Sequence, residues 1–163
     1  MQKTFHTTVN KEHLFTIVLI AENIRTPENL GMIMRISEAF AVEKIYFAGS
    51  AHTELTTKAK RTSRNTFKTM QYEFCEDGQS PLTLLKQSGY STLALEITEN
   101  SVGINTFRTE KNKFALVVGS ERRGVSAQLL DLCDHHLHIS MFGDNSSLNV
   151  VNALSIALYE ITK

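Results

Sequence analysis

A regular alternation of strand-like apolar runs and helix-like segments constrains the fold of this chain most. The run at residues 14–21 is apolar and β-rich, as in a buried strand, and Pro27 and Glu28 then suit the first turn of a helix. Further strands are predicted at residues 43–49, 70–75, 92–97, 114–119 and 136–140, and helices at residues 27–41, 54–61, 81–88, 126–132 and 148–161. The alternation predicts an α/β domain with a mostly parallel sheet flanked by helices.

Length and composition narrow the class of protein further. The 163 residues suit a single domain over residues 1–163, and neither of the two prolines marks a boundary. Lysine plus arginine equals aspartate plus glutamate at 17 each, so any case for nucleic acid must be local. Cys75 and Cys133 are isolated, and no signal peptide or membrane-spanning run is visible. We therefore expect a cytoplasmic protein without a structural disulfide or membrane contact.

Two predicted helices are apolar around almost their whole circumference. In residues 148–161 apolar side chains surround the helix axis, and the helix that carries Arg35 is similar. A chain of this size cannot easily bury two such helices alone. A homodimer that packs them together is the favoured prediction, and a thickly covered sheet within one chain is the alternative.

Several common ligand motifs are absent or incomplete. No GxGxxG follows the first strand, so the phosphate loop of a dinucleotide fold is missing. Residues 119–126 have glycines at P-loop spacing, but the pair Val125 and Ser126 lacks the lysine that the motif requires. His136 and His138 share a strand face, yet no carboxylate or cysteine completes a ligand set, so no metal is predicted.

Three polar, glycine-bearing loops each follow a predicted strand. They span residues 21–31, 119–126 and 140–149, and ligands of open parallel sheets gather at these strand ends. Free backbone N–H groups with serine and asparagine side chains suit a nucleoside better than a triphosphate. The alternative for Ser147 or Asn149 is that either residue only caps the following helix.

A local basic run lies between the second and third predicted strands. It contains no acid, and its hydroxyl, amide and aromatic neighbours could add to a grip on phosphates; its five cations are Lys58, Lys60, Arg61, Arg64 and Lys68. A solvated basic face is the alternative. Because the whole chain is neutral, we interpret this concentration of charge as a nucleic-acid contact.

The three loops and their flanks resemble a known family. ENLGMIMRISEAF, LVVGSERRGVS and HISMFGDNSSLNVVNALSIALYE resemble, in order and spacing, the three motifs of the SpoU/TrmH branch of the SPOUT methyltransferases. Members of this branch transfer a methyl group from S-adenosylmethionine to a ribose 2′-hydroxyl in tRNA or rRNA. The sequence departs from the family pattern at Ser140, where proline is usual, at Ala41, where glycine is common, and at Asn152, where a small residue is more usual.

The resemblance implies a fold and an assembly. The family's C-terminal segment forms a deep trefoil knot, here roughly residues 114–163, which no sequence pattern would suggest because knots are so rare. The family dimerises through its first and last helices. No separate RNA-binding domain is visible, so the basic run would supply much of the grip on RNA, with tRNA expected ahead of rRNA as the substrate.

The resemblance also assigns site residues by position. The catalytic set is Asn29, Arg35, Glu121, Ser147 and Asn149, and the S-adenosylmethionine site is Gly119, Ile139, Met141, Ser147 and Leu148. Arg35 stays protonated, so it would bind a phosphate bidentately or stabilise the oxyanion of the attacking hydroxyl rather than act as a base.

Three alternatives stay open at this point. Arg35 could instead form an ion pair with Glu121 or Glu38 that has no catalytic task. The chain could be a non-enzymatic relative that kept the knot and binds RNA or the cofactor. It could also belong to the sister branch that methylates a base nitrogen, although the helix of Arg35 favours ribose.

Overall fold

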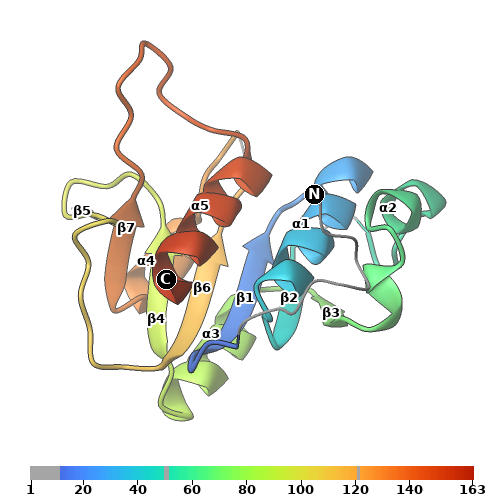
Figure 1. The fold of residues 1–163 in the computed structure, drawn as a ribbon, viewed down its shortest axis with the longest axis horizontal. Helices are drawn as coiled ribbons and strands as arrows, with labels where there is room; N and C mark the ends of the chain where they lie inside the picture. The colour runs from blue at the N-terminus through green and yellow to red at the C-terminus, as the bar shows by residue number, and fades with distance from the viewer. Residues whose placement is uncertain (1–11, 50–51, 121) are drawn as a thin grey trace, which may run out of the picture.

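One seven-stranded sheet forms the centre of the molecule. A computed structural model describes residues 12–49, 52–120 and 122–163 (Figure 1). The strands run in the order β3-β2-β1-β6-β4-β7-β5, and all the pairings between neighbours are parallel. The strands are β1 (Thr16–Glu22), β2 (Lys44–Ala48), β3 (Gln71–Cys75), β4 (Ser91–Leu95), β5 (Val102–Gly103), β6 (Lys113–Val118) and β7 (His135–His138). The predicted α/β architecture with a parallel sheet is confirmed.

Helices cover both faces of this sheet. In Figure 1, α1 and α5 lie side by side in front of the sheet, while α3 and α4 lie behind it. The helices are α1 (Pro27–Ala39), α2 (Thr57–Thr62), α3 (Gln79–Gln87), α4 (Ala127–Leu132) and α5 (Val150–Thr162), with a short 3₁₀ helix, η2 (Thr66–Lys68). All five predicted helices are therefore present, with ends shifted by up to three residues.

The buried run in β1 explains why two faces need covering. Side chains alternate along a strand, so Ile17 and Leu19 join the cluster under α1 and α5, while Ile20 joins the cluster with Leu82 of α3 and Leu129 of α4. Residues 17–22 of β1 are all buried. A strand apolar on both faces is the signature of a central strand in a parallel sheet.

Strand β5 was missed by the sequence analysis. It contains two residues, Val102 and Gly103, and pairs with β7 beyond the expected edge of the sheet. A two-residue strand that includes a glycine is too short to produce a periodic pattern. The strand predicted at residues 136–140 ends earlier, at His138, so that residues 139–149 form one long loop between β7 and α5 that stands away from the sheet (Figure 1).

Helix α1 is tied at both ends to its neighbours. At its first turns, a Cβ on Gly31 would overlap the carbonyl oxygen of Ala59 in α2, so glycine permits the close approach of the two helices. At its end, Ala41 has a φ of 50° and donates its N–H to the Glu38 oxygen at 3.0 Å, while Val42 N–H reaches the Ser37 oxygen at 2.9 Å. This is a Schellman ending with alanine in the left-handed position that favours glycine.

Helices α1 and α5 pack against each other and against the sheet, so much of their apolar surface is already covered within one chain. On α5, Ile156 and Tyr159 stay 38% and 61% exposed. The dimer and the knot stay predictions, because strand order and packing within one chain address neither. Within the described residues, no helix is both long and apolar enough to cross a membrane.

Candidate functional site

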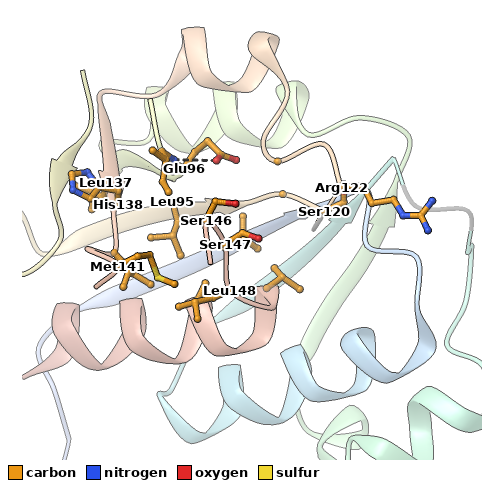
Figure 2. Close-up of a pocket in the computed structure, with 17 residues that line it drawn as sticks. Leu95, Glu96, Ser120, Arg122, Leu137, His138, Met141, Ser146, Ser147 and Leu148 are labelled. Carbon is orange, nitrogen blue, oxygen red and sulfur yellow. Dashed lines mark hydrogen bonds between the residues drawn. The ribbon is translucent and has the colours of Figure 1, made fainter. Parts of the chain in front are cut away.

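A cavity lies at the carboxyl ends of β4, β6 and β7, where the loops 119–126 and 139–149 meet (Figure 2). Its volume is about 190 Å³. All five residues predicted for the cofactor line it: Gly119, Ile139, Met141, Ser147 and Leu148. We call it the Gly119 cavity. The structure thus brings together residues from two loops that α4 and β7 separate in the sequence.

The lining of the Gly119 cavity combines apolar walls with a few polar groups. Leu95 and Leu137 come from the ends of β4 and β7, and Val150 comes from the first turn of α5. Figure 2 shows the polar groups of Glu96, Ser146 and Ser147 around the same space. Mostly apolar walls with a few fixed polar groups are the usual lining of a small-molecule site.

A tight glycine turn shapes one wall of the cavity. Gly124 has a φ of +64° and donates its N–H to the Ser120 oxygen at 2.8 Å. A Cβ on Gly119 would overlap the backbone of Gly124, and a Cβ on Gly124 would overlap the carboxylate of Glu96. Both glycines are therefore required by the close approach of backbone to backbone and of backbone to carboxylate.

Two carboxylates that the sequence analysis missed hold this turn. Glu96 Oε2 accepts from Val125 N–H at 2.8 Å, and Glu22 Oε2 accepts from Ser126 N–H at 2.8 Å. Glu22 is only 9% exposed. Hydrogen bonds to a charged acceptor are stronger than neutral ones, so the pair fixes the start of α4. The signal that could have revealed them is an acidic residue at the carboxyl end of an apolar strand, where parallel-sheet sites form.

Two of the predicted catalytic residues contact each other beside the cavity. Asn149 Nδ2 donates to Asn29 Oδ1 at 3.3 Å, which links the loop before α5 to the first turn of α1. Asn149 also caps α5, because its Oδ1 accepts from Val151 N–H at 2.9 Å. The capping alternative is thus correct for Asn149, but it does not exclude the contact with Asn29. Ser147 is exposed and lines the cavity instead of capping α5.

Arg35 is not brought into the Gly119 cavity. It is half-buried on α1, six residues beyond Asn29, and is not among the residues that line the cavity. Within the described part of the chain no ion pair joins Arg35 to Glu38, so that structural alternative has no support. Glu121, the fifth residue of the predicted catalytic set, lies outside the described residues.

The basic run forms an exposed surface on α2, η2 and the turn between them. Lys58, Lys60, Arg61, Arg64 and Lys68, which we call the basic patch, are all exposed. Lys58 forms an ion pair with Glu28 of α1, and the hydrogen bond from Lys58 holds the pKa of Glu28 below its ordinary value. The patch therefore lies on the side of α1 that faces α2.

The hydroxyl groups beside this patch already have partners within the chain. The hydroxyl groups expected to grip phosphates are engaged with backbone carbonyls: Thr62 with Lys58 at 2.9 Å, and Ser63 with Lys60 and Thr66 with Ser63 at 2.8 Å each. These short-range bonds complete the turns of α2 and η2, a competition typical of serine and threonine. The ring of Phe67 is half-buried against the core. The patch thus offers mainly its charges.

The thiols and histidines have structural surroundings. Burial raises the pKa of the Cys133 thiol to about 12 and also raises that of Cys75, so both thiols stay protonated and weakly nucleophilic. His136 bonds to Thr98 Oγ1 at 3.1 Å and to the Leu130 oxygen at 3.0 Å. Within residues 12–49, 52–120 and 122–163, no group of three potential ligands is placed to hold a metal ion.

Comparison with protein families and curated sequences gives consistent matches. A model of the SpoU rRNA methylase family matches residues 16–159. A protein of Mycobacterium bovis named as an uncharacterized tRNA/rRNA methyltransferase is 30% identical over 148 residues, which are 90% of this chain and 51% of that protein. A protein of Staphylococcus haemolyticus, named for the TrmH family of tRNA/rRNA methyltransferases, is 28% identical, and the alignment covers 93% of this chain and 60% of that protein. The chain spans about half the length of the first of these relatives.

Solved structures share the fold. The TrmH/SpoU tRNA modifying enzyme of A. aeolicus superposes with a TM-score of 0.81 at 26% identity, covering 91% of this chain and 76% of its own. The AdoMet-bound rRNA methyltransferase of Sinorhizobium meliloti gives a TM-score of 0.82 at 20% identity. The superposition covers 90% of this chain and 55% of that methyltransferase chain. At that identity the second likeness concerns the fold alone.

Proposed function

Since the chain belongs to the SpoU rRNA methylase family, we propose that it transfers a methyl group from S-adenosylmethionine to a ribose 2′-hydroxyl in RNA. We expect tRNA rather than rRNA as its substrate, in the cytoplasm. The observation that carries the proposal is the Gly119 cavity, which gathers all five residues expected to hold the cofactor. Beside the cavity, the bond between Asn29 and Asn149 joins two residues expected to act on the acceptor.

The residues of the Gly119 cavity fit S-adenosylmethionine. Leu95, Leu137 and Leu148 offer an apolar wall suited to an adenine ring, while Ser146 and Ser147 offer hydroxyls for the polar parts. The carboxylate of Glu96 is the charged group of opposite sign to a sulfonium. The cofactor supplies an electrophilic methyl group, and the chain's task is to align donor and acceptor. The knotted path of residues 114–163, which we also propose, would hold the two loops around it.

Arg35 is proposed to contact RNA rather than cofactor. Six residues along a helix correspond to about 9 Å of rise, so Arg35 lies well beyond Asn29 in the direction away from the cavity. That placement favours a bidentate contact with a backbone phosphate over direct stabilisation of the reacting oxygen. Asn29 and Asn149, which lie closer to the cavity, would then orient the ribose hydroxyl.

Three features support RNA as the substrate. The basic patch presents exposed cations on the α2 side of α1. Phe142, in the loop that borders the Gly119 cavity, is 98% exposed and could stack on an unpaired base. The A. aeolicus neighbour is named as a tRNA modifying enzyme, which favours tRNA here. We also propose a homodimer through α1 and α5, supported by the exposed Ile156 and Tyr159 on α5.

The test is methyl transfer from S-adenosylmethionine labelled on its methyl group to bulk tRNA and, separately, to rRNA, followed by digestion to nucleosides. We expect the label in 2′-O-methylnucleosides from tRNA. Label on a base would mean that the protein methylates a base and not a ribose. Label in rRNA alone would overturn the choice of tRNA as the substrate. Binding of the cofactor and RNA without any transfer would favour the non-enzymatic alternative.

A further inference from the structure

A second cavity adjoins the Gly119 cavity at the carboxyl ends of β1 and β6. Its volume is about 370 Å³, and it is lined by Asn23, Arg25, Thr26, Ser120, Arg122 and Arg123. We call it the arginine cavity. Ser120 and Arg122 line both cavities, so the two are neighbours across the loop that follows β6. None of its three arginines belongs to a site predicted from the sequence.

The described lining of the arginine cavity is strongly positive. Among the residues that the structure describes, the lining includes three arginines and no acid, and arginine stays protonated in proteins. The ion pairs found in the described part of the chain lie elsewhere and involve none of the three. Like charges in one cavity repel one another, and an anion bound between them would relieve that repulsion.

The topology of the sheet places a binding crevice at this point. From β1 the chain continues into α1 on one face of the sheet, whereas from β6 it continues into α4 on the other face. The two connections therefore diverge between neighbouring parallel strands, which is where ligands of open α/β sheets bind. Thr26, the N-cap of α1, lines the cavity and adds the positive end of a thirteen-residue helix.

The side chain of Arg122 connects the two sites. Figure 2 shows its guanidinium pointing away from the side chains that gather in the Gly119 cavity, on the side of Ser120. An anion held there would lie outside the cofactor space but next to it. The fork of a guanidinium matches the oxygens of a phosphate, so a phosphate is the anion that such a cluster suits best.

We propose that the arginine cavity binds a backbone phosphate of the RNA beside the ribose that is methylated. The proposal rests on the proposed function, because it takes RNA as the substrate. In RNA the 2′-hydroxyl is on the carbon next to the one that bears the 3′-phosphate, so a clamp on that phosphate fixes the position of the 2′-oxygen. Such a contact positions the strand without reading its sequence. It is separate from the phosphate contact proposed for Arg35, which lines neither cavity.

The test removes the three charges and compares the result with a matched removal elsewhere. One variant carries Arg25→Gln, Arg122→Gln and Arg123→Gln. The control carries Arg108→Gln, Lys111→Gln and Lys113→Gln, three exposed cations at or just before the amino-terminal end of β6, whereas the arginine cavity lies at its carboxyl end. Binding of bulk tRNA is measured over a range of salt concentrations, and binding of S-adenosylhomocysteine and of 5′-methylthioadenosine is measured by calorimetry.

The cavity variant should bind tRNA about tenfold more weakly than the control, the loss expected when charged hydrogen bonds to a phosphate disappear. The slope of log affinity against log salt should fall by about one relative to the control, since one phosphate contact is lost. The control should bind S-adenosylhomocysteine as the unchanged protein does, and so should an Arg25→Gln, Arg123→Gln variant that keeps Arg122, which lines both cavities. Equal tRNA affinity and slope in the two variants would overturn the proposal.

Other anions are separated by the same measurements. A cavity variant that loses affinity for S-adenosylhomocysteine but not for 5′-methylthioadenosine, which lacks the carboxylate, would assign the arginines to the cofactor instead. Calorimetric binding of inorganic phosphate that only the cavity variant loses, with unchanged tRNA binding, would mean a free-phosphate site and would also overturn the proposal. If tRNA binding falls as expected but no variant or unchanged protein transfers methyl groups, the phosphate site stands and the proposed reaction fails.

Discussion

At the scale of single residues, Arg35 is the charged group whose setting most needs an explanation. Its neighbours along α1, Met34 and Ile36, are apolar, and no carboxylate pairs with it within the described residues. A half-buried guanidinium that no carboxylate of the described residues neutralises suits an anionic ligand. The proposed ligand is a phosphate of the bound RNA.

Arg35→Ala should reduce methyl transfer by at least about a hundredfold while leaving the dissociation constant for S-adenosylhomocysteine within about twofold, since the residue is outside the cofactor cavity. Arg35→Lys should recover little of the activity, because an ammonium keeps the charge but not the fork. Steady-state transfer and calorimetry measure the two effects. Unchanged turnover in Arg35→Ala would remove Arg35 from the mechanism.

Glu96 is the residue at which the structure adds most to the sequence. Its carboxylate lines the Gly119 cavity and holds the Val125 N–H at 2.8 Å. Glu96→Gln keeps the size but loses the charge, so we expect about tenfold weaker binding of S-adenosylmethionine, since charged hydrogen bonds are the stronger ones. Binding of 5′-methylthioadenosine, which has no sulfonium, should weaken less. Equal weakening for both ligands would mean that Glu96 acts by holding the turn alone.

At the scale of elements, the end of α1 stores strain at one position. Ala41 occupies the left-handed position of a Schellman ending with a φ of 50°. A left-handed conformation costs about 1 kcal/mol for a residue with a Cβ, and glycine avoids this cost. Glycine is also what the family resemblance leads one to expect after Phe40.

Ala41→Gly should therefore raise the free energy of unfolding by up to about 1 kcal/mol. The gain is the strain that glycine relieves in the folded protein, reduced by the greater flexibility that glycine gives the unfolded chain. Ala39→Gly, two residues earlier and also exposed, changes the last residue of α1, which is right-handed, and should lower the free energy of unfolding by up to about 1 kcal/mol. Urea unfolding of both variants measures the difference. A loss of stability in Ala41→Gly as large as in Ala39→Gly would contradict the strain at this position.

The long elements could be predicted from sequence because their signals are local. The buried run in β1 and the proline start of α1 each fix a type of element without help from the rest of the chain. Strand β5 could not be predicted, because only its pairing with β7 makes two residues a strand. The roles of Glu22 and Glu96 likewise depend on a turn about 100 and 30 residues further along the chain, a proximity that the fold creates and no periodicity encodes.

The candidate site was partly accessible from sequence for a different reason. The five residues of the cofactor prediction follow from a resemblance in motif order, and the structure collects them in one cavity. The sequence suggests that hydroxyl groups beside the basic patch add to its contact with phosphates, but in the structure these hydroxyl groups bond to nearby backbone carbonyls. Sequence shows which side chains are present, and packing decides which of their donors are already used.

At the scale of the whole molecule, the surface of α5 bears on the proposed dimer. Ile156 and Tyr159 are about one helical turn apart and are the exposed large apolar residues of α5, whereas Leu154, Ala157 and Leu158 are buried. A second copy packed against this face would cover both.

A variant with Ile156→Glu and Tyr159→Glu should be monomeric by light scattering, because two charges would have to be buried in the interface. Leu84→Glu, at a 60% exposed apolar position of α3, is the control and should stay dimeric. Transfer activity measured at the same protein concentration then reports whether assembly matters for the reaction. If light scattering shows that the unchanged protein is monomeric at micromolar concentration, the proposed dimer is excluded.

The most direct test of the account is whether S-adenosylhomocysteine binds in the Gly119 cavity. Calorimetry compares the unchanged protein with Gly119→Ala, whose added Cβ would overlap the Gly124 backbone, and with Gly143→Ala, whose Cβ would meet nothing within 4 Å. We predict binding to the unchanged protein and to Gly143→Ala, and its loss in Gly119→Ala with the far-ultraviolet circular dichroism retained. No binding to the unchanged protein, or full binding to Gly119→Ala, would contradict the assignment of this cavity to the cofactor.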